Sequence, residues 1–342
     1  MTRTTRMARR RRCAALAVTT ALLGTGAVLN APPVTASPAT ASPAAVAPAA
    51  AVAAGATVVA EKWLDTRTVD LTVASPAVGA SLPVRVVLPT KYAAQPDRTW
   101  PVLYLLQGAH DDYTSWTRET DVVDFLAGQD VITVMPSSGP TGIPTDWWNY
   151  GSAGAPDYEA FQVDELMGLL QQKFRAGTKR AVAGVSTGGY GALAFAARHP
   201  GTFTAAASYS GILDTTAFGM PTVLNAIVAR EQLLPLTLWG SPLLNRDNWN
   251  RHNPSAQAAN LKGTSLYISQ GSGLAGGDFD NLEGAVLEGA LWSQAHRFTD
   301  RLDALGIPAQ VHFYNGGAHA WPYWRQEFKA SWPMLAAGLG LS

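Results

Sequence analysis

The chain has 342 residues, 47% of them hydrophobic, and its 25 basic and 25 acidic side chains cancel to a formal net charge of zero. A neutral chain with no basic stripe beyond its first residues argues against a nucleic acid as partner. The only cysteine, Cys13, allows no intramolecular disulfide and no thiolate metal cluster. Histidines and carboxylates also do not recur at ligand spacing, so we expect neither a metal nor a cofactor.

The first 36 residues have the parts of a secretion signal. Arginines at positions 3, 6 and 9–12 precede an apolar run from Cys13 to Leu29, and a small-residue cleavage site follows at 33–36. The run is short, rich in Ala, Thr and Gly, and followed by proline, which fits a membrane anchor less well. Residues 37–56 are nearly all small residues and proline, a composition typical of a linker. We therefore expect export and one domain over residues 57–342.

Strand-like and helical patterns alternate through this domain. The expected strands lie at 67–73, 82–88, 101–107, 130–135, 180–184, 204–209, 264–269 and 309–314, and the clearest helices at 157–174, 188–198 and 284–304. This alternation predicts an α/β fold with a mostly parallel sheet covered on both faces. The first two strands are close in sequence and should form an antiparallel hairpin at the sheet edge. Residues 214–262 lack strand signals and predict a helical excursion over the functional site.

Gly184-Val185-Ser186-Thr187-Gly188 is a G-x-S-x-G motif with a strand pattern before it and a helix pattern after it. A strand that turns sharply into a helix holds its central serine in a strained conformation with the hydroxyl exposed. The flanking glycines let the two elements pass close together. The motif predicts a nucleophile elbow at Ser186, and a Gly-rich surface turn is the alternative interpretation.

A serine nucleophile needs a base, and the base needs an orienting acid; in this arrangement the acid precedes the histidine in the chain. His319 follows the strand-like run 309–314 and a glycine-containing loop, which places it past the carboxyl end of a late strand. His312 lies inside that strand, whereas His252 and His296 lie in polar surroundings without turn chemistry to hold them. We therefore expect His319 to be the base.

Four carboxylates are candidates for the acid, because all follow the strand-like run 264–269: Asp278, Asp280, Glu283 and Glu288. Position favours Asp278 or Asp280, since a triad acid usually lies directly behind its strand. The residue pattern alone does not separate these two aspartates.

Short motifs follow one another from Leu103 to the C-terminus. They are Tyr104-Leu105-Leu106-Gln107-Gly108, Asp111-Asp112-Tyr113, Asp146-Trp147-Trp148, Gly184-Val185-Ser186, Ser210-Gly211-Ile212-Leu213-Asp214, Arg251-His252-Asn253-Pro254, Leu287-Glu288-Gly289 and His319-Ala320-Trp321-Pro322-Tyr323-Trp324. These motifs and their order over about 240 residues resemble those of the antigen 85-type mycolyltransferases that mycobacteria secrete. Those enzymes fall within the wider esterase D family of α/β-hydrolases.

The resemblance implies an α/β-hydrolase fold and an acyl-enzyme mechanism. It assigns the catalytic acid to Glu288, beside Ser186 as nucleophile and His319 as base. It also implies an oxyanion hole made by the backbone N–H groups of Ala109 and Thr187.

The resemblance also concerns the substrate. The mycolyltransferases hold trehalose with an aspartate and an arginine, and Gln107 and His110 stand at these positions here. Because a neutral pair binds sugar hydroxyls differently, we expect acyl-ester chemistry without a preference for trehalose. Four tryptophans near the predicted site are expected to contact an acyl chain or a sugar, with core packing as the alternative: Trp147, Trp148, Trp321 and Trp324.

Taken as a sequence, the chain is interpreted as a secreted serine esterase or acyltransferase. Its substrate is expected to be an acyl ester or a lipid, and its acceptor water, a sugar or glycerol. We expect a monomer that works outside the cell or at the cell envelope. Two alternatives are a feruloyl-type carbohydrate esterase and a non-catalytic relative that binds the cell wall or matrix. The presence of all three triad residues argues against the latter.

Overall fold

The computed structural model describes residues 55–154, 156–276 and 281–341. The expected secretion signal at 1–36 and nearly all of the expected linker at 37–56 lie outside these residues, as do Asp278 and Asp280. Within the described ranges, no helix combines the length and apolar character needed to cross a membrane.

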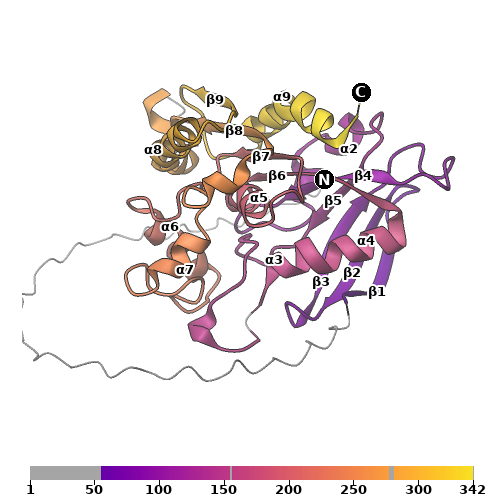
Figure 1. Ribbon diagram of the computed structural model, residues 1–342, viewed down its shortest axis with the longest axis horizontal. Helices are drawn as coiled ribbons and strands as arrows, with labels where there is room; N and C mark the ends of the chain where they lie inside the picture. The colour runs from indigo at the N-terminus through magenta and orange to yellow at the C-terminus, as the bar shows by residue number, and fades with distance from the viewer. Residues whose placement is uncertain (1–54, 155, 277–280, 342) are drawn as a thin grey trace, which may run out of the picture. The chain divides into compact units, whose positions relative to one another are not determined.

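A nine-stranded sheet runs through the described part of the chain in the order β1-β2-β3-β5-β4-β6-β7-β8-β9 (Figure 1). Successive pairs from β1 to β5 along this order are antiparallel, and those from β5 to β9 are parallel. The strands are β1 Thr57–Trp63, β2 Thr68–Ser75, β3 Ala80–Val87, β4 Trp100–Leu106, β5 Ile132–Pro136, β6 Ala176–Val185, β7 Ala205–Tyr209, β8 Ser265–Gly271 and β9 Gln310–Tyr314.

Nine α-helices lie between and after these strands in the described part of the chain. They are α1 Ser115–Glu119, α2 Val122–Phe125, α3 Tyr158–Ala160, α4 Leu166–Phe174, α5 Thr187–Arg198, α6 Met220–Arg230, α7 Arg246–Arg251, α8 Leu282–Ala304 and α9 Trp321–Leu339. A π-helical turn at Phe161–Glu165 joins α3 to α4, and short 3-10 segments lie at Asn149–Gly151, Ala258–Leu261 and Gly273–Gly276.

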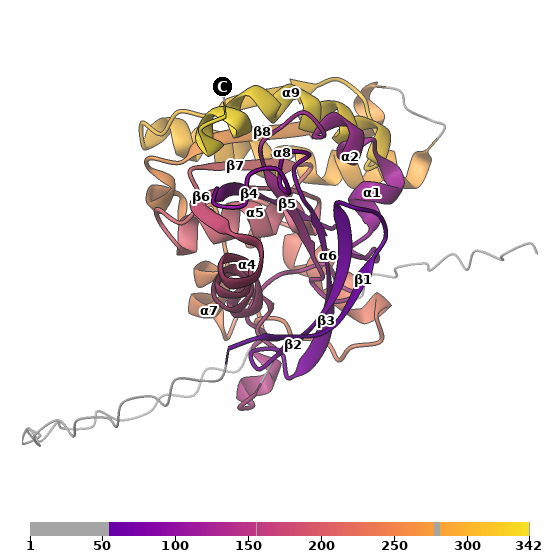
Figure 2. The ribbon, with the colours of Figure 1, turned by 90° about the vertical axis from the view of Figure 1, so that its right-hand side faces the viewer.

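The sheet is covered on both faces, which explains why its central strands are continuously apolar. In β4, Val102 and Leu106 face a core shared with α4, α5 and α8, whereas Leu103 and Leu105 face a core shared with α1, α2 and α9. Figure 2 shows α9 and α2 on one side of the sheet and α4 and α5 on the other. The expected α/β fold with a mostly parallel sheet is confirmed.

All eight expected strands are present, and the first two pair antiparallel along their whole length. Their expected position at the sheet edge was wrong, because β1 pairs outside β2. This strand was missed because nearly all its residues are exposed, which leaves no apolar alternation to detect. Helix α9 was also missed; Pro322 and Pro333 lie within its span and interrupt the usual helical pattern.

The excursion at 214–262, which is fully described, contains α6, α7 and a 3-10 segment but no strand. Its apolar residues form a third core, in which Leu224 and Val228 of α6 lie with Trp239, Trp249 and Tyr190, the last from α5. This packing attaches the excursion to the helix that follows the G-x-S-x-G motif. The excursion is therefore tied to the element that carries the expected nucleophile.

A buried histidine adds a polar attachment. His252 is 1% exposed, and its ring nitrogens contact Asp146 at 2.6 Å and the Asn248 carbonyl at 2.7 Å. Burial opposes ionisation of Asp146, but His252 and Arg198 outweigh it and hold the pKa of Asp146 below its ordinary 3.8. The expectation that no local structure holds His252 was therefore wrong: Asn248 lies four residues earlier in the chain, and Asp146 comes from a distant loop.

Candidate active site

The turn between β6 and α5 has the geometry of a nucleophile elbow. Ser186 has φ 55° and ψ −120°, a conformation that non-glycine residues rarely adopt. A Cβ on Gly184 would lie 2.1 Å from the Gly188 carbonyl oxygen, and one on Gly188 would lie 2.4 Å from the Gln107 carbonyl oxygen. Only glycine fits these two contacts, so the motif allows the strand, the helix and the end of β4 to meet at Ser186.

Ser186, His319 and Glu288 form a continuous chain of hydrogen bonds. Ser186 Oγ lies 2.8 Å from His319 Nε2, and His319 Nδ1 lies 2.9 Å from Glu288 Oε2. With the Nδ1–H tautomer, the imidazole donates to the carboxylate and accepts from the serine hydroxyl. The histidine comes from the loop between β9 and α9, and its backbone N–H donates to the Gly284 carbonyl of α8 at 3.0 Å.

Glu288 occupies the second turn of α8, and its side chain is fully buried. Its Oε1 accepts from the Gly271 N–H at 2.8 Å and from the Ser210 hydroxyl at 2.7 Å, while its Oε2 faces His319. A buried carboxylate is tolerated when donors satisfy both oxygens, as they do here. Of the other candidate acids, Glu283 is exposed in the first turn of α8.

The two residues expected to supply the oxyanion hole both lie near Ser186. Thr187 is the first residue of α5, and amides in the first turn of a helix have no intrahelical acceptor. Ala109 lines the same pocket as Ser186 and lies in the loop after β4. A Cβ on Gly142 would lie 2.2 Å from the Gly108 carbonyl oxygen, so a second segment packs closely behind this loop.

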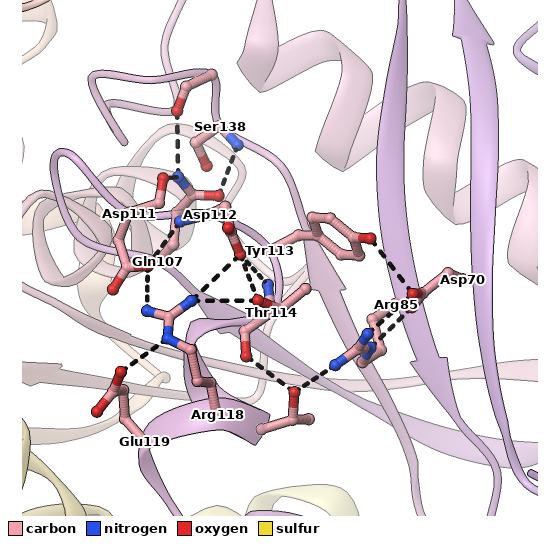
Figure 3. A network of polar contacts seen from close by, with 12 residues as sticks. Asp70, Arg85, Gln107, Asp111, Asp112, Tyr113, Thr114, Arg118, Glu119 and Ser138 are labelled. Carbon is pink, nitrogen blue, oxygen red and sulfur yellow. Dashed lines mark hydrogen bonds and ion pairs between the residues drawn. The ribbon is translucent and has the colours of Figure 1, made fainter. Parts of the chain in front are cut away.

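Gln107 supports the Ala109 loop from behind (Figure 3). The side chain is 1% exposed; its Nε2 donates to the Asp111 carbonyl at 2.6 Å and to the Gly139 carbonyl at 3.1 Å. Its Oε1 lies 3.4 Å from the Ser138 N–H. Gln107 is not among the described residues that line the pocket, so the structure does not place it where it was expected to meet a substrate.

Charged residues brace the far end of the same loop. Arg118 donates to Asp111 at 2.6 Å and to Glu119 at 2.7 Å, and these hydrogen bonds raise the pKa of the guanidinium (Figure 3). Beside them, Arg85 forms a two-pronged ion pair with Asp70, at 2.7 and 2.8 Å. The loop is thus held by side chains from β2, β3 and α1.

Changing Gln107 to Glu is expected to destabilise this loop. The carboxylate has nearly the shape of the amide but cannot donate, so it would face two carbonyl oxygens in a buried site. A cost of about 2–3 kcal/mol in the free energy of unfolding is expected. Urea denaturation of the two proteins measures it.

The matched control is Gln95→Glu, because Gln95 is only partly buried, lies before β4 and outside this loop, and accepts from Arg98 at 2.9 Å. Equal stability of Gln107→Glu and the parent would contradict the supporting role of the amide. The same result would reopen a direct role for Gln107 in binding.

A pocket of about 710 Å³ opens over Ser186 and His319. One wall is apolar and includes Val223 and Ile227 of α6 together with Trp321. Polar and charged lining residues are also present: His110, Asp111, Glu119 and Arg230. The excursion therefore reaches the site through α6, as the sequence suggested.

His110 links the Ala109 loop to the end of α6, because its Nδ1 contacts the Glu231 carboxylate. Trp321 and Trp324 line the pocket, as expected, and the Trp324 ring meets the His319 ring edge-on at 4.9 Å. Trp147 is buried in the third core, and Trp148 lies in a separate hollow beside α7. Neither of these two reaches the described lining of the pocket.

The remaining histidines lie outside the pocket. His312 pairs with Glu327 at 2.9 Å, and the His296 ring stacks on Phe313 at 3.9 Å. Among the described residues, no group of three or more His, Cys, Asp or Glu is arranged to hold a metal ion.

Sequence reasoning missed Ser210 and the hydrogen bond that the Trp324 indole donates to it. The Ser210 hydroxyl joins Glu288 to the Trp324 indole, and these three residues come from the loop directly after β7, from α8 and from α9. The only sequence signal was the Ser210-Gly211 pair directly after a strand. Such a pair carries no information on which distant carboxylate it meets.

Comparison with known proteins identifies the family of the chain. The family model described as "Putative esterase" matches residues 75–335. The mycolyltransferase Ag85B of Mycobacterium intracellulare, named as a diacylglycerol acyltransferase, is 30% identical over 256 residues, covering 71% of this chain and 76% of its own. The esterase Rv1288 of Mycobacterium tuberculosis is 31% identical over 252 residues, or 70% of this chain, but the match spans only 53% of that longer protein.

A solved S-formylglutathione hydrolase of Agrobacterium tumefaciens superposes with a TM-score of 0.66 at 15% identity, covering 83% of this chain and 99% of its own. At this identity the likeness shows a shared fold. The expected resemblance to mycolyltransferases and to α/β-hydrolase esterases is thus confirmed.

Proposed function

Because the chain belongs to this esterase family, we propose that it is a serine-dependent acyl-ester enzyme with Ser186 as nucleophile, His319 as base and Glu288 as acid. One observation carries the proposal: the hydrogen-bond chain from Ser186 Oγ through both ring nitrogens of His319 to the buried Glu288 carboxylate. The strained conformation of Ser186 supports it, since such strain is common at functional sites.

The first half of the reaction forms an acyl-enzyme. Ser186 Oγ attacks the ester carbonyl carbon while its proton passes to His319 Nε2. We assign the N–H groups of Ala109 and Thr187 to the oxyanion that develops, an arrangement worth about a hundredfold or more per donor. The intermediate collapses, the ester C–O bond breaks, and His319 returns the proton to the leaving alkoxide. Glu288 stabilises the transient imidazolium.

The second half reverses these roles. Water or an alcohol gives its proton to His319 and attacks the acyl carbon. The bond from the acyl carbon to Ser186 Oγ then breaks, His319 returns the proton to that oxygen, and a free acid or a new ester leaves. The apolar wall from α6 and Trp321 suits a short to medium acyl chain. Gln107 is committed to the loop behind the site and His110 to Glu231, so no charged pair remains at these positions to hold trehalose. We propose export to the cell exterior or envelope, from the N-terminal pattern alone.

Mass spectrometry with a short-chain ester tests the function and the acceptor together. We expect the peptide containing Ser186 to gain the mass of one acyl group when the reaction is quenched early. Offered water, glycerol and trehalose, the enzyme should form free acid and glyceride in excess over trehalose ester. A trehalose ester as the main product would contradict the proposed acceptor, and an unmodified Ser186 peptide would contradict the mechanism.

The feruloyl-type esterase stays a second candidate within the same chemistry, because the aromatic side of Trp321 in the pocket suits a planar acyl group. Release of ferulate from a feruloylated polysaccharide, at a rate above that for a butyrate ester, would favour it.

A further inference from the structure

Ser210 is a second strained serine near the site. It follows β7 directly and has φ 52°, in the left-handed region that only small or asparagine-like residues visit with ease. It is 1% exposed, and its backbone N–H donates to the Ser269 carbonyl of β8 at 2.9 Å. A strained, buried residue that is not glycine persists only where the surrounding structure fixes it.

The hydroxyl of Ser210 has a partner on either side. It donates to Glu288 Oε1 at 2.7 Å and accepts from the indole Nε1–H of Trp324 at 3.0 Å. A carboxylate only accepts and an indole N–H only donates, so the two partners together fix the direction of the hydroxyl hydrogen. The hydrogen must point to Glu288.

This contact determines how the carboxylate faces the histidine. Glu288 Oε1 receives two donors, the Ser210 hydroxyl and the Gly271 N–H, while Oε2 is left to His319. With Oε1 held from two directions, rotation of the carboxylate about its last bond would break both bonds. The imidazole thereby keeps a fixed acceptor at Nδ1, which is what holds Nε2 toward Ser186.

Trp324 completes the arrangement from the other side. The same indole that donates to Ser210 packs edge-on against the His319 ring, at 4.9 Å and 88°. One side chain thus contacts both the imidazole and the residue that holds its acid. Its position follows from α9, whose first turn carries it.

We propose that Ser210 is a positioning residue of this enzyme, which acts through Glu288 to hold the imidazole in its productive orientation and tautomer. The inference rests on the proposed triad. The side chain touches no reacting atom, so its removal should slow turnover without weakening substrate binding.

Two variants separate the effect of the Ser210 hydroxyl from the effect of its backbone strain. Ser210→Ala removes the hydroxyl and keeps the positive φ, whereas Ser210→Gly removes it and relieves the strain. Both are expected to lower kcat about 10- to 100-fold for a short-chain ester, with KM within about twofold of the parent. If Ser210→Ala fails to fold, Ser210→Gly still provides the measurement.

Ser208→Ala is the matched control. Ser208 lies two residues earlier in β7, is 0% exposed, and its hydroxyl has no hydrogen-bond partner among the described residues. We expect its kcat to stay within about twofold of the parent, because the change removes no hydrogen bond of the described residues. A loss equal to that of the Ser210 variants would overturn the proposal, because it would show a general sensitivity of β7.

A double-mutant cycle tests whether Ser210 acts through the acid. In a Glu288→Gln background, Ser210→Gly is expected to lower kcat by less than about twofold, since the group it positions is already disabled. The same 10- to 100-fold loss in that background, or full activity of Ser210→Gly in the parent background, would overturn the inference.

If the proposed triad itself is wrong, the outcome differs from the one expected when only the role of Ser210 is wrong. A fluorophosphonate probe labels an activated serine, and we expect it to label Ser186 in the parent and, more slowly, in Ser210→Gly. A parent enzyme in which Ser186 stays unlabelled while ester cleavage continues would contradict the proposed triad, and the role of Ser210 with it. Labelling in the parent with unchanged labelling in Ser210→Gly contradicts the role of Ser210 alone.

Discussion

Replacement of Ser186 by alanine is expected to lower kcat for ester cleavage by a factor of about 10⁴ or more. The hydroxyl is the atom that would bond to the acyl carbon, and alanine offers no substitute. Hydrolysis of a p-nitrophenyl ester under saturating substrate measures the effect. Activity within a few-fold of the parent would exclude Ser186 as the nucleophile.

This variant should remain folded. Ser186 keeps its backbone bonds, including an N–H donated to the Tyr209 carbonyl at 2.9 Å, and among the described residues the side-chain bond lost is the one to His319. Its thermal midpoint should therefore lie within a few degrees of the parent. A collapse in stability together with the lost activity would show that the hydroxyl is structural, so both quantities must be measured on the same preparation.

Replacement of Glu288 by glutamine is expected to lower kcat by about 10³- to 10⁴-fold. The neutral amide cannot stabilise an imidazolium, and it also disturbs a site built from donors. If its oxygen faces the Gly271 N–H and the Ser210 hydroxyl, its NH₂ group must face His319 and favours the wrong tautomer. Steady-state kinetics on a short-chain ester give the comparison.

Glu283→Gln is the matched control, since Glu283 lies on the same helix and is exposed. Its kcat should equal that of the parent. Asp278→Asn and Asp280→Asn complete the test, because position behind β8 favoured these residues over Glu288. If either aspartate variant loses more activity than Glu288→Gln, the acid is that aspartate and the assignment of Glu288 is contradicted.

Local patterns were enough for every strand of the sheet except β1, and for the serine that we propose as the nucleophile. The central parallel strands are buried on both faces, so each appears in the sequence as a short apolar run bounded by turn residues. The elbow is also local: Gly184 and Gly188 allow the close approach that the turn requires, and both lie within two residues of Ser186. His319 was found by topology, because the loop that follows a late parallel strand must lie at the carboxyl edge of the sheet.

The residues that surround the serine and the histidine come from distant parts of the chain, and the sequence did not predict these contacts. Residue types alone could not choose between Glu288 and the aspartates, and the donors to Glu288 come from Ser210 and Gly271, the ends of two adjacent strands. Gln107 was expected to face a substrate and instead supports a loop. Trp147 was expected near the pocket and lies in the core around α6.

The chain by itself therefore determined the α/β class and the order of eight of the nine strands along the sequence, and it pointed to the serine and histidine of the proposed site. These results follow from the spacing of apolar residues, from the glycines at turns and from the order of motifs along the chain, all of which can be read without knowing distant contacts. The tertiary structure alone decided which oxygen of Glu288 meets the imidazole and which face of α6 lines the pocket. These depend on contacts between segments about 20 to 130 residues apart, whose geometry is set by packing and not by any local preference.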